Sequence, residues 1–373
     1  MAEPTIVREP PRAAGRAVEL LRLDARGATP ARDAVAVEEP LEIRLNGWRW
    51  LVTMRTPGDD ADLIVGLLAA EGVIAAAAEV AQVVFTRHPD DPELANVADV
   101  RLARPLGDLQ KRLVRNQVLA SSSCGLCGAS AVEAVRARGA PVDPGPEVDA
   151  ATLAGLAARL AEAQPVFRAT GGLHAAALFD AGGRLLAARE DVGRHNATDK
   201  VLGWRLRAGA AGRDAAILMV SGRASFEIVQ KALAARVPIV AAVSAPSSLA
   251  ADLAEAAGIT LAGFVRGAGF NVYAGRARVR ARAGALADAG AAASDDALAA
   301  AAVETIPRAM RALLDAAGLK ISLADWQALT VGERTRLLAL VAEGDAAAFA
   351  GYLRARVEAR TGRAPRPLAP RHP

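Results

Sequence analysis

The strongest constraint on the fold is an alternation of apolar runs and helix-forming segments between residues 195 and 275. We expect the runs to be strands because they are apolar at consecutive positions, as strands covered on both faces are. They comprise residues 215–220, 238–243 and 259–264. The helices expected between them comprise residues 196–206, 225–235 and 247–256. Strands that alternate with helices predict an α/β domain with a largely parallel sheet flanked by helices.

The N-terminal part has a different pattern, which predicts a small α+β portion before the main sheet. Apolar residues at 41–45 and 49–54 flank Asn46-Gly47, a dipeptide typical of a two-residue hairpin turn. An acidic run at 59–62 precedes an apolar-periodic helix at 63–70. Further strands are expected at 82–86, 99–102, 114–120, 173–179 and 185–188, and further helices at 128–137 and 150–163.

Changes in composition suggest domain boundaries. Residues 1–35 lack clear periodicity and are expected to form a loose N-terminal arm. The α/β domain is expected to cover residues 36–282, and the Ala-, Gly- and Asp-rich residues 283–302 to form a linker. Residues 303–363 are expected to form a helical appendage, followed by a disordered Pro- and Arg-rich tail at 364–373.

Composition also limits the classes of partner. The 373-residue chain has a formal net charge of +4 and no basic run interleaved with aromatic residues, so we expect no nucleic acid partner. No apolar stretch reaches the roughly 20 residues that span a membrane, and the N-terminus lacks a basic start followed by an apolar core. We therefore expect a cytoplasmic protein that binds no membrane.

Cys124 and Cys127 are the only cysteines, and they lie three positions apart in a Ser- and Gly-rich stretch, residues 121–128. So close a pair cannot staple a chain of this length, which favours functional thiols in a reducing compartment. The stretch joins an expected strand to an expected helix, and a position at the start of a helix favours the thiolate, the nucleophilic form. A buried structural role is less favoured because serine and glycine make a poor core.

Other roles for the cysteine pair can be weighed from its surroundings. A zinc site normally needs four ligands, and the four histidines show no metal-pair spacing, so we expect no bound metal. The signature of zinc deaminases requires His-x-Glu and a proline before the first cysteine. Here Ala176 stands two positions after His174, where the glutamate would be, and Ser123 precedes Cys124. A thioredoxin-type redox pair remains open, although such pairs normally open a helix in a much smaller domain.

Two polar loops lie near the ends of expected strands. In the first, Gly171 and Gly172 precede His174, and adjacent glycines let a ligand approach the backbone closely. The second, residues 190–200, gathers ionisable side chains at a strand-to-helix junction, among them His195 near the first turn of the helix. An ordinary turn and a solvated helix start are the alternatives for these two loops.

A third loop combines Ser221, Arg223 and Ser225 at the start of an expected helix, a combination suited to phosphate. A similar Ser-rich loop at 244–248 follows the next strand without an arginine. Because ligands of α/β sheets gather where such strands end, this repetition favours an anion site. Together with a thiolate pair, these loops indicate sulfur chemistry on a large polyphosphorylated ligand.

Taken together, the motifs resemble the formate dehydrogenase accessory sulfurtransferases, the FdhD family. The resemblance covers roughly residues 35–280 and rests on five motifs in the same order. They are residues 121–128, 170–174, 190–196, 221–225 and 264–273. The resemblance implies a mixed sheet similar to that of the cytidine deaminases, without their zinc catalysis.

The resemblance also implies a function. A cysteine desulfurase would load sulfane sulfur onto Cys124 as a persulfide, with Cys127 as its partner. A homodimer would bind the guanine nucleotide portions of bis(molybdopterin guanine dinucleotide) and sulfurate this cofactor before its insertion into formate dehydrogenase. The implied cofactor-binding segment is Phe264, Val265, Arg266, Gly267, Ala268 and Gly269. Two other classes stay open: a non-catalytic chaperone that carries the cofactor, and a dithiol oxidoreductase.

The C-terminal segment carries a separate resemblance. Residues 306–311 and 318–320, with Trp326, are similar to a small nitrate-reductase-associated protein, over about residues 303–363. A generic helical appendage is the alternative. If the resemblance holds, the chain joins two molybdoenzyme-related modules.

Overall fold

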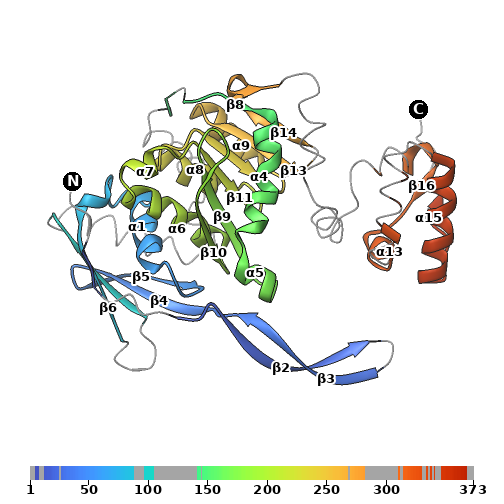
Figure 1. Ribbon diagram of the computed structural model, residues 1–373, viewed down its shortest axis with the longest axis horizontal. Helices are drawn as coiled ribbons and strands as arrows, with labels where there is room; N and C mark the ends of the chain where they lie inside the picture. The colour runs from blue at the N-terminus through green and yellow to red at the C-terminus, as the bar shows by residue number, and fades with distance from the viewer. Residues whose placement is uncertain are drawn as a thin grey trace. The chain divides into compact units, whose positions relative to one another are not determined.

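A computed structural model shows two compact units, Met1–Gly290 and Ala291–Pro373 (Figure 1). The described residues are 5–7, 12–24, 27–87, 96–104, 141–143, 145–267, 269–281, 314–329 and 346–367, with Met310, Glu333, Arg334, Leu337 and Leu340. The cysteine stretch, the strand and helix expected beside it, and the expected linker lie outside the described residues.

The larger unit is built around a six-stranded sheet with the strand order β10-β9-β11-β12-β13-β14. Its parallel centre consists of β11 (Ile217–Val220), β12 (Ile239–Ala242) and β13 (Thr260–Arg266). The flanking strands, antiparallel to their neighbours, are β9 (His174–Phe179), β10 (Leu185–Asp191) and β14 (Gly269–Ala274). The expected α/β class and the mixed sheet implied by the resemblance are confirmed. The expectation of a largely parallel sheet, drawn from the alternation of strands and helices, is wrong because a hairpin lies on each side of the parallel strands.

Helices cover both faces of this sheet, and alternation along each strand separates two cores (Figure 1). Leu218 and Val220 belong to the core beneath the three helices that follow the sheet strands. These helices are α6 (Arg194–Arg207), α8 (Phe226–Ala234) and α9 (Ser248–Ala256). Ile217 and Met219 belong to the opposite core, beneath α4 (Ala150–Glu162). Burial on both faces explains why β11 is apolar at every position.

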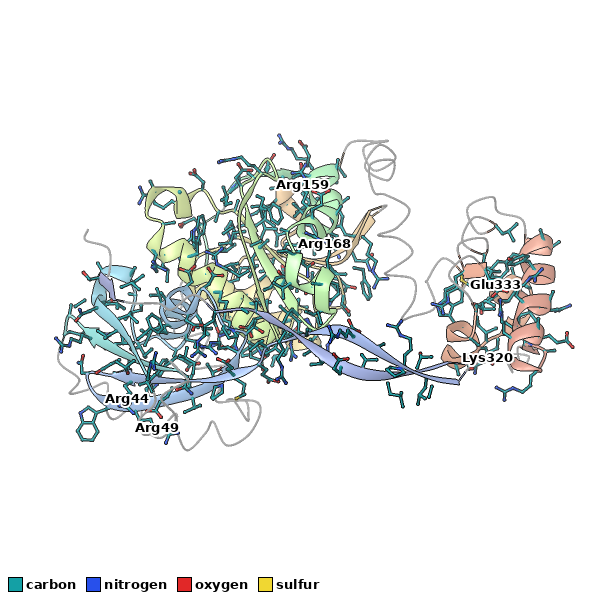
Figure 2. All side chains as sticks on the ribbon, turned by 60° about the horizontal axis from the view of Figure 1, so that its bottom comes forward. Arg44, Arg49, Arg159, Arg168, Lys320 and Glu333 are labelled. Atoms are coloured by element: carbon teal, nitrogen blue, oxygen red, sulfur yellow. The ribbon has the colours of Figure 1, made fainter. Side chains whose placement is uncertain are left out.

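Short elements complete the larger unit. They are η1 (Ala77–Glu79), α5 (Pro165–Thr170), α7 (Ala210–Arg213), η2 (Arg276–Arg278) and the paired strands β8 (Val148–Asp149) and β15 (Val279–Arg280). Arg159 of α4 donates to the carbonyl oxygen of Gly183 in the β9–β10 turn (Figure 2). Arg168 of α5 donates to the carbonyl oxygens of Ala161 and Glu162, 2.9 Å away in each case, which fixes α5 against the end of α4.

The N-terminal α+β portion is a five-stranded sheet with helix α1 (Asp60–Ala70). Its strands, in the order β1-β6-β7-β4-β5, are β1 (Thr5–Val7), β6 (Val80–Thr86), β7 (Val97–Leu102), β4 (Glu39–Leu45) and β5 (Trp48–Arg55). Asn46 and Gly47 have φ values of 50° and 85°, as a two-residue turn with positive φ requires. The expected hairpin is confirmed.

Residues 15–36 form a hairpin, so the expectation of a loose arm is wrong there. β2 (Gly15–Asp24) and β3 (Gly27–Ala36) pair along their whole length, and no third strand joins them in the part of the chain that the structure describes. Leu21 and Leu23 are 59% and 72% exposed. A ribbon with so little burial lacks the periodicity that makes a strand visible in a sequence.

Two glycines bring α1 and α6 into backbone contact. A Cβ placed on Gly66 of α1 would lie 1.9 Å from the carbonyl oxygen of Asp199, and one on Gly203 of α6 would lie 1.8 Å from that of Asp62. Such distances are far below any real contact, so the helices cross at this distance only with glycine at both positions. This contact joins the N-terminal portion to the main sheet.

The smaller unit, described by itself, has its own apolar core around Trp326, Phe349 and Leu353. Its described elements are β16 (Leu319–Lys320), α13 (Leu323–Gln327), α15 (Ala346–Thr361) and β17 (Arg366–Pro367). Arg360 of α15 donates to Glu333, with an Nε–Oε2 distance of 3.1 Å (Figure 2). β17 pairs with β16, so the expected disordered tail is wrong at these two residues, where backbone pairing supplies an order that composition does not indicate. None of the helices among the described residues is long and apolar enough to cross a membrane.

We predict that Gly203→Ala lowers the free energy of unfolding of the larger unit by about 1–3 kcal/mol or more, because the added methyl group forces α1 and α6 apart. Urea unfolding followed by circular dichroism measures the change. Gly155→Ala in α4 is the matched control, since a Cβ there meets nothing within 4 Å; it should stabilise the unit by roughly 0.5–1 kcal/mol. Equal stability of Gly203→Ala and wild type would contradict the α1–α6 contact.

Candidate functional site

Five polar loops meet at one edge of the central sheet. The end of β11 pairs with the start of β9, Val220 with Ala176. The end of β10 also pairs with the start of β9, Asp191 with His174. The parallel strands β12 and β13 end at the same edge as β11, and β14 begins there, since Arg266 pairs with Gly269. The loops singled out in the sequence are thereby neighbours in space, although they span about a hundred residues.

Backbone hydrogen bonds join these loops to one another. Ser221 donates its N–H to the carbonyl oxygen of Ala175 at 2.9 Å, and its Oγ accepts the N–H of Ala175 at 2.9 Å. Ser247 N–H donates to Ala224 O at 3.1 Å, and Phe264 N–H to Ser244 O at 3.1 Å. Backbone hydrogen bonds therefore connect the loops along this edge, and each loop is held in place by its neighbour.

The β10–α6 corner is fixed by a buried ion pair. Lys200 Nζ lies 2.8 Å from Asp191 Oδ2, with side-chain exposures of 1% and 0%. Asp191 also accepts the N–H groups of Thr56 at 3.1 Å and Gly193 at 2.9 Å, and Lys200 donates to Thr56 O at 2.8 Å. These bonds satisfy both buried charges, which an isolated pair could not do without a large desolvation cost. Asn196 joins the network by donating to Asp191 at 3.2 Å.

Glu190, next to Asp191, holds the first glycine loop in place. Its carboxylate accepts the N–H groups of Val166 at 3.0 Å and Phe167 at 2.7 Å, at the start of α5. The helix ends at Gly171, which has a φ of 67°, and a Cβ on Gly172 would lie 3.3 Å from that of Ala36. Gly171 and Gly172 thus serve the helix end and its packing on the β2–β3 hairpin.

Two histidines lie at this edge, and both are neutral at neutral pH. Burial, then the charge of Arg194, lowers the pKa of His174, while Asp191 acts in the opposite direction. Burial, then Arg194 and Lys231, lowers the pKa of His195 to about 4, against the opposing charge of Glu227. His195 Nε2 lies 3.4 Å from Ser225 Oγ.

A second buried pair joins α6 to α8 behind the histidines. Lys231 Nζ lies 2.7 Å from both carboxylate oxygens of Asp199, whose side chain is 1% exposed. Burial nevertheless raises the pKa of Asp199 to about 6, with Lys231 opposing the shift. His195, Asp199 and Lys200 all belong to α6, and each has a different set of partners.

The β13–β14 turn is the last of the five loops. Phe264 has a φ of 55°, a left-handed conformation that is rare for a bulky residue, and the guanidinium of Arg266 lies 5.9 Å from the centre of its ring. Arg266 Nε also donates to Val243 O at 3.4 Å. Val265 is buried in the core beneath α4, so its side chain is not available to a ligand.

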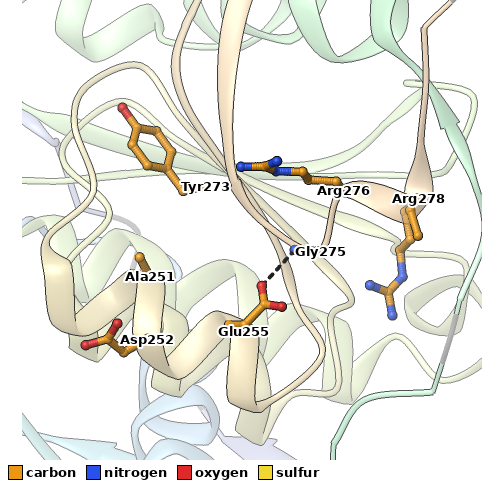
Figure 3. A pocket seen from close by; sticks show the side chains of 8 residues that line it. Ala251, Asp252, Glu255, Tyr273, Gly275, Arg276 and Arg278 are labelled. Atoms are coloured by element: carbon orange, nitrogen blue, oxygen red, sulfur yellow. Dashed lines mark hydrogen bonds between the residues drawn. The ribbon is translucent and has the colours of Figure 1, made fainter.

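A cavity of about 650 Å³ lies elsewhere, between α9 and the end of β14 (Figure 3). Its walls carry acids of α9, Asp252 and Glu255, and the basic residues Arg276 and Arg278. Gly275 in its wall accepts from Thr260, the first residue of β13, so the cavity lies at the opposite end of that strand from the polar loops. Charges of both signs give it no preference for an anion.

Residues 36–280, more than half of the chain, match the model of the FdhD/NarQ family. The chain belongs to the FdhD/NarQ family. Residues 297–372 match a second model, the Conserved nitrate reductase-associated protein. Both resemblances seen in the sequence are thereby confirmed.

Similar proteins bear the name Sulfur carrier protein FdhD. The one from Anaeromyxobacter dehalogenans strain 2CP-1 is 51% identical over 239 residues, which are 62% of this chain and 83% of that protein. The Nocardia farcinica protein is 50% identical over 241 residues, 63% and 84% of the two chains. A solved structure from Desulfotalea psychrophila, described as a formate dehydrogenase accessory protein, has a TM-score of 0.57 at 24% identity and covers 72% of this chain and 100% of its own. That likeness extends the fold to a distant relative.

The structure brings together most of the site residues predicted for this family member. At the edge lie His174, His195, Ser221, Ser225, Arg266, Gly267 and Gly269, with the exposed Arg223. Cys124, Cys127 and Ala268 lie outside the described residues. Arg194 and Glu227 were missed, although Arg194 stands beside His195 in a motif that was already singled out. Among the described residues, no three His, Cys, Asp or Glu side chains are placed to hold a metal ion.

We predict that Lys231→Met lowers the free energy of unfolding by about 3–5 kcal/mol at pH 8, because it leaves Asp199 ionised, buried and unpaired. The loss should shrink at pH 5. A carboxyl whose pKa is raised on folding binds more protons when folded, so its contribution to stability is present at low pH and falls as pH rises through the folded-state pKa. Urea unfolding at the two pH values measures both effects.

Two further variants act as controls for this prediction. Asp199→Asn combined with Lys231→Met should remove the pH-dependent part of the loss. Arg184→Met breaks a pair with Asp180 in which Arg184 is 69% exposed, and it should change stability by less than about 1 kcal/mol. A loss at pH 5 as large as that at pH 8 would contradict the assignment to Asp199.

Proposed function

We propose that this chain is a sulfur carrier that passes persulfide sulfur from a cysteine desulfurase to bis(molybdopterin guanine dinucleotide) for formate dehydrogenase. Membership of the FdhD/NarQ family, with relatives named Sulfur carrier protein FdhD at about 50% identity, is the observation that carries the proposal. Cys124 carries the sulfur and Cys127 assists it. The protein acts in the cytoplasm as a homodimer.

The loading step is a thiol–persulfide exchange. The Cys124 thiolate attacks the terminal sulfur of the donor persulfide, a new S–S bond forms at Cys124, and the donor leaves as a thiolate. One S–S bond breaks and one forms, so the step needs no external oxidant or reductant. The serine and glycine neighbours of Cys124 suit a segment that must meet both a donor and an acceptor.

The cofactor is the substrate that accepts the sulfur, and the loops at the sheet edge suit its guanine nucleotide portions. Arg223 is exposed on the β11–α8 loop, where Ser225 precedes α8. Arg266 and the backbone of Gly267 and Gly269 offer charge and amide donors one loop away. Arginine forks and backbone N–H groups are common partners of diphosphates.

Two other functions remain distinct alternatives. A chaperone that only carries the cofactor would bind guanine nucleotides at the same loops without holding persulfide. A dithiol oxidoreductase would cycle through a Cys124–Cys127 disulfide and reduce insulin.

The second unit matches the nitrate-reductase-associated family model. Under the proposed function, it adds a second molybdoenzyme-related module to the same chain.

We predict that incubation with a cysteine desulfurase and cysteine adds about 32 Da, one sulfur atom, to the peptide that contains Cys124. Cys124→Ala should abolish this addition and the maturation of formate dehydrogenase in a deletion strain, and Cys127→Ala shows how far the second cysteine contributes to loading. Peptide mass spectrometry without reductant makes the measurement. Full maturation with Cys124→Ala would refute the role of this cysteine, and loading of Cys124 with persulfide would refute a chaperone that holds none.

We also predict that Arg223→Ala weakens binding of guanosine diphosphate by about 10-fold, because an exposed guanidinium that binds a phosphate supplies a charged hydrogen bond. Isothermal titration calorimetry measures the affinity. Arg223 is exposed on its loop, so the variant should keep the thermal unfolding midpoint of the wild type. An unchanged affinity would remove Arg223 from the site.

A further inference from the structure

Arg194, the first residue of α6, has a buried donor without an acceptor. Its Nε is inaccessible to solvent and finds no hydrogen-bond partner in the described part of the chain. A buried N–H left unpaired costs about 1–3 kcal/mol, so such groups are rare unless a ligand or water completes them.

The space beside Arg194 is kept open by a glycine. A Cβ on Gly222 would lie in ordinary contact with Arg194 Cδ, at 3.8 Å, and with His174 Nδ1, at 3.7 Å, so a larger side chain would crowd both residues. His195, the next residue of α6, lies on the other side, 3.4 Å from Ser225. Three elements, β9, α6 and the β11–α8 loop, thus direct basic or polar groups toward one small region.

The two lysines near this region are already engaged in ion pairs, unlike Arg194 Nε. Lys200 is paired with Asp191, and Lys231 with Asp199. Glu227 of α8 is the remaining acid, with its Oε2 3.9 Å from His195 Nε2. Burial acts to raise the pKa of Glu227, but the Ser225 hydroxyl and the backbone N–H of Glu227 lower it overall, so Glu227 is ionised.

We propose that Arg194, His174 and His195 form an oxyanion subsite that binds a phosphate group at the sheet edge. The Arg194 guanidinium is the anchor, and the space beside Gly222 admits the anion. The proposal rests on the function proposed above only for the source of the anion, a diphosphate of the guanine nucleotide. Free phosphate offers the same chemistry, and the experiment distinguishes the two.

Proton uptake should accompany anion binding. Both histidines are neutral in the free protein because burial and the charge of Arg194 lower the pKa of each. Lys231 also lowers the pKa of His195, whereas Asp191 raises that of His174 and Glu227 raises that of His195. An anion at Arg194 offsets these effects and raises the pKa of each histidine. The bound state then holds more protons than the free state, so affinity rises as pH falls, by at most about tenfold per pH unit for each histidine.

The test is calorimetric titration of the full-length protein with pyrophosphate and, separately, with guanosine diphosphate, from pH 7.5 to 5.5. Arg194→Gln should weaken both by about 10- to 100-fold, the usual range for a charged hydrogen bond. Gly222→Val should also weaken both, by filling the space without changing any charge. Arg213→Gln is the matched control, because Arg213 is an exposed arginine of α7, beyond the far end of α6, and it should bind both ligands like wild type.

Each outcome decides the proposal. The ratio of wild-type affinity to that of a His174→Gln, His195→Gln double variant cancels the protonation of the ligand itself. A ratio that rises from pH 7.5 to 5.5 supports the proposal, and a ratio independent of pH overturns it. Unchanged binding in Arg194→Gln and Gly222→Val, with unchanged thermal unfolding midpoints, also overturns it. Tighter binding of guanosine diphosphate than of pyrophosphate identifies the nucleotide as the source, and a site that prefers pyrophosphate overturns that assignment. Failure of Cys124 to load sulfur would refute the proposed function and leave these affinities unaffected.

Discussion

The buried ion pair between Asp191 and Lys200 is the interaction on which the rest of the site depends. It closes the corner between β10 and α6 and binds the backbone of Thr56 from both sides, Asp191 through the N–H and Lys200 through the carbonyl oxygen. Thr56 follows β5, so this pair also ties the N-terminal portion to the main sheet. Loss of either charge would leave the other buried and unpaired, which is far more costly than losing a surface pair.

The corner in turn sets the direction of α6. The helix begins at Arg194, so Arg194 and His195 lie at the strand ends, and its middle packs on α1 through Gly203. One helix thus provides stability along its length and, in the proposed function, ligand-binding residues at its start. The cavity beside α9 and η2 lies at the other end of β13, where both signs of charge are present, and it takes no part in this arrangement.

The main sheet could be predicted from the sequence because burial on both faces leaves strands apolar and short, as in β11 and β12. The Asn46-Gly47 hairpin was visible for a local reason, the need for positive φ at two consecutive positions. The β2–β3 ribbon was not, because exposed strands carry no burial pattern. The cytidine-deaminase likeness of the sheet stays a prediction.

The sequence indicated which loops form the candidate site, but it did not indicate which residues contact one another there. Small and hydroxyl residues at strand ends indicate a ligand edge whatever the partner, which is how the loops at 170–174 and 221–225 were found. The role of Arg194 depends on a missing acceptor and on the space at Gly222, and both are properties of packing. Likewise, Asp199 and Lys200 stand next to each other in sequence but have partners on different elements.

Hydrogen exchange measured by mass spectrometry, with and without guanosine diphosphate, tests the central claim most directly. If the polar edge of the sheet is the ligand site, exchange should slow at residues 170–175, 190–196, 221–226, 244–248 and 264–270 together, because these loops share one strip of paired backbone. Protection confined to residues 251–255 and 273–278, around the cavity at the opposite end of β13, would contradict it.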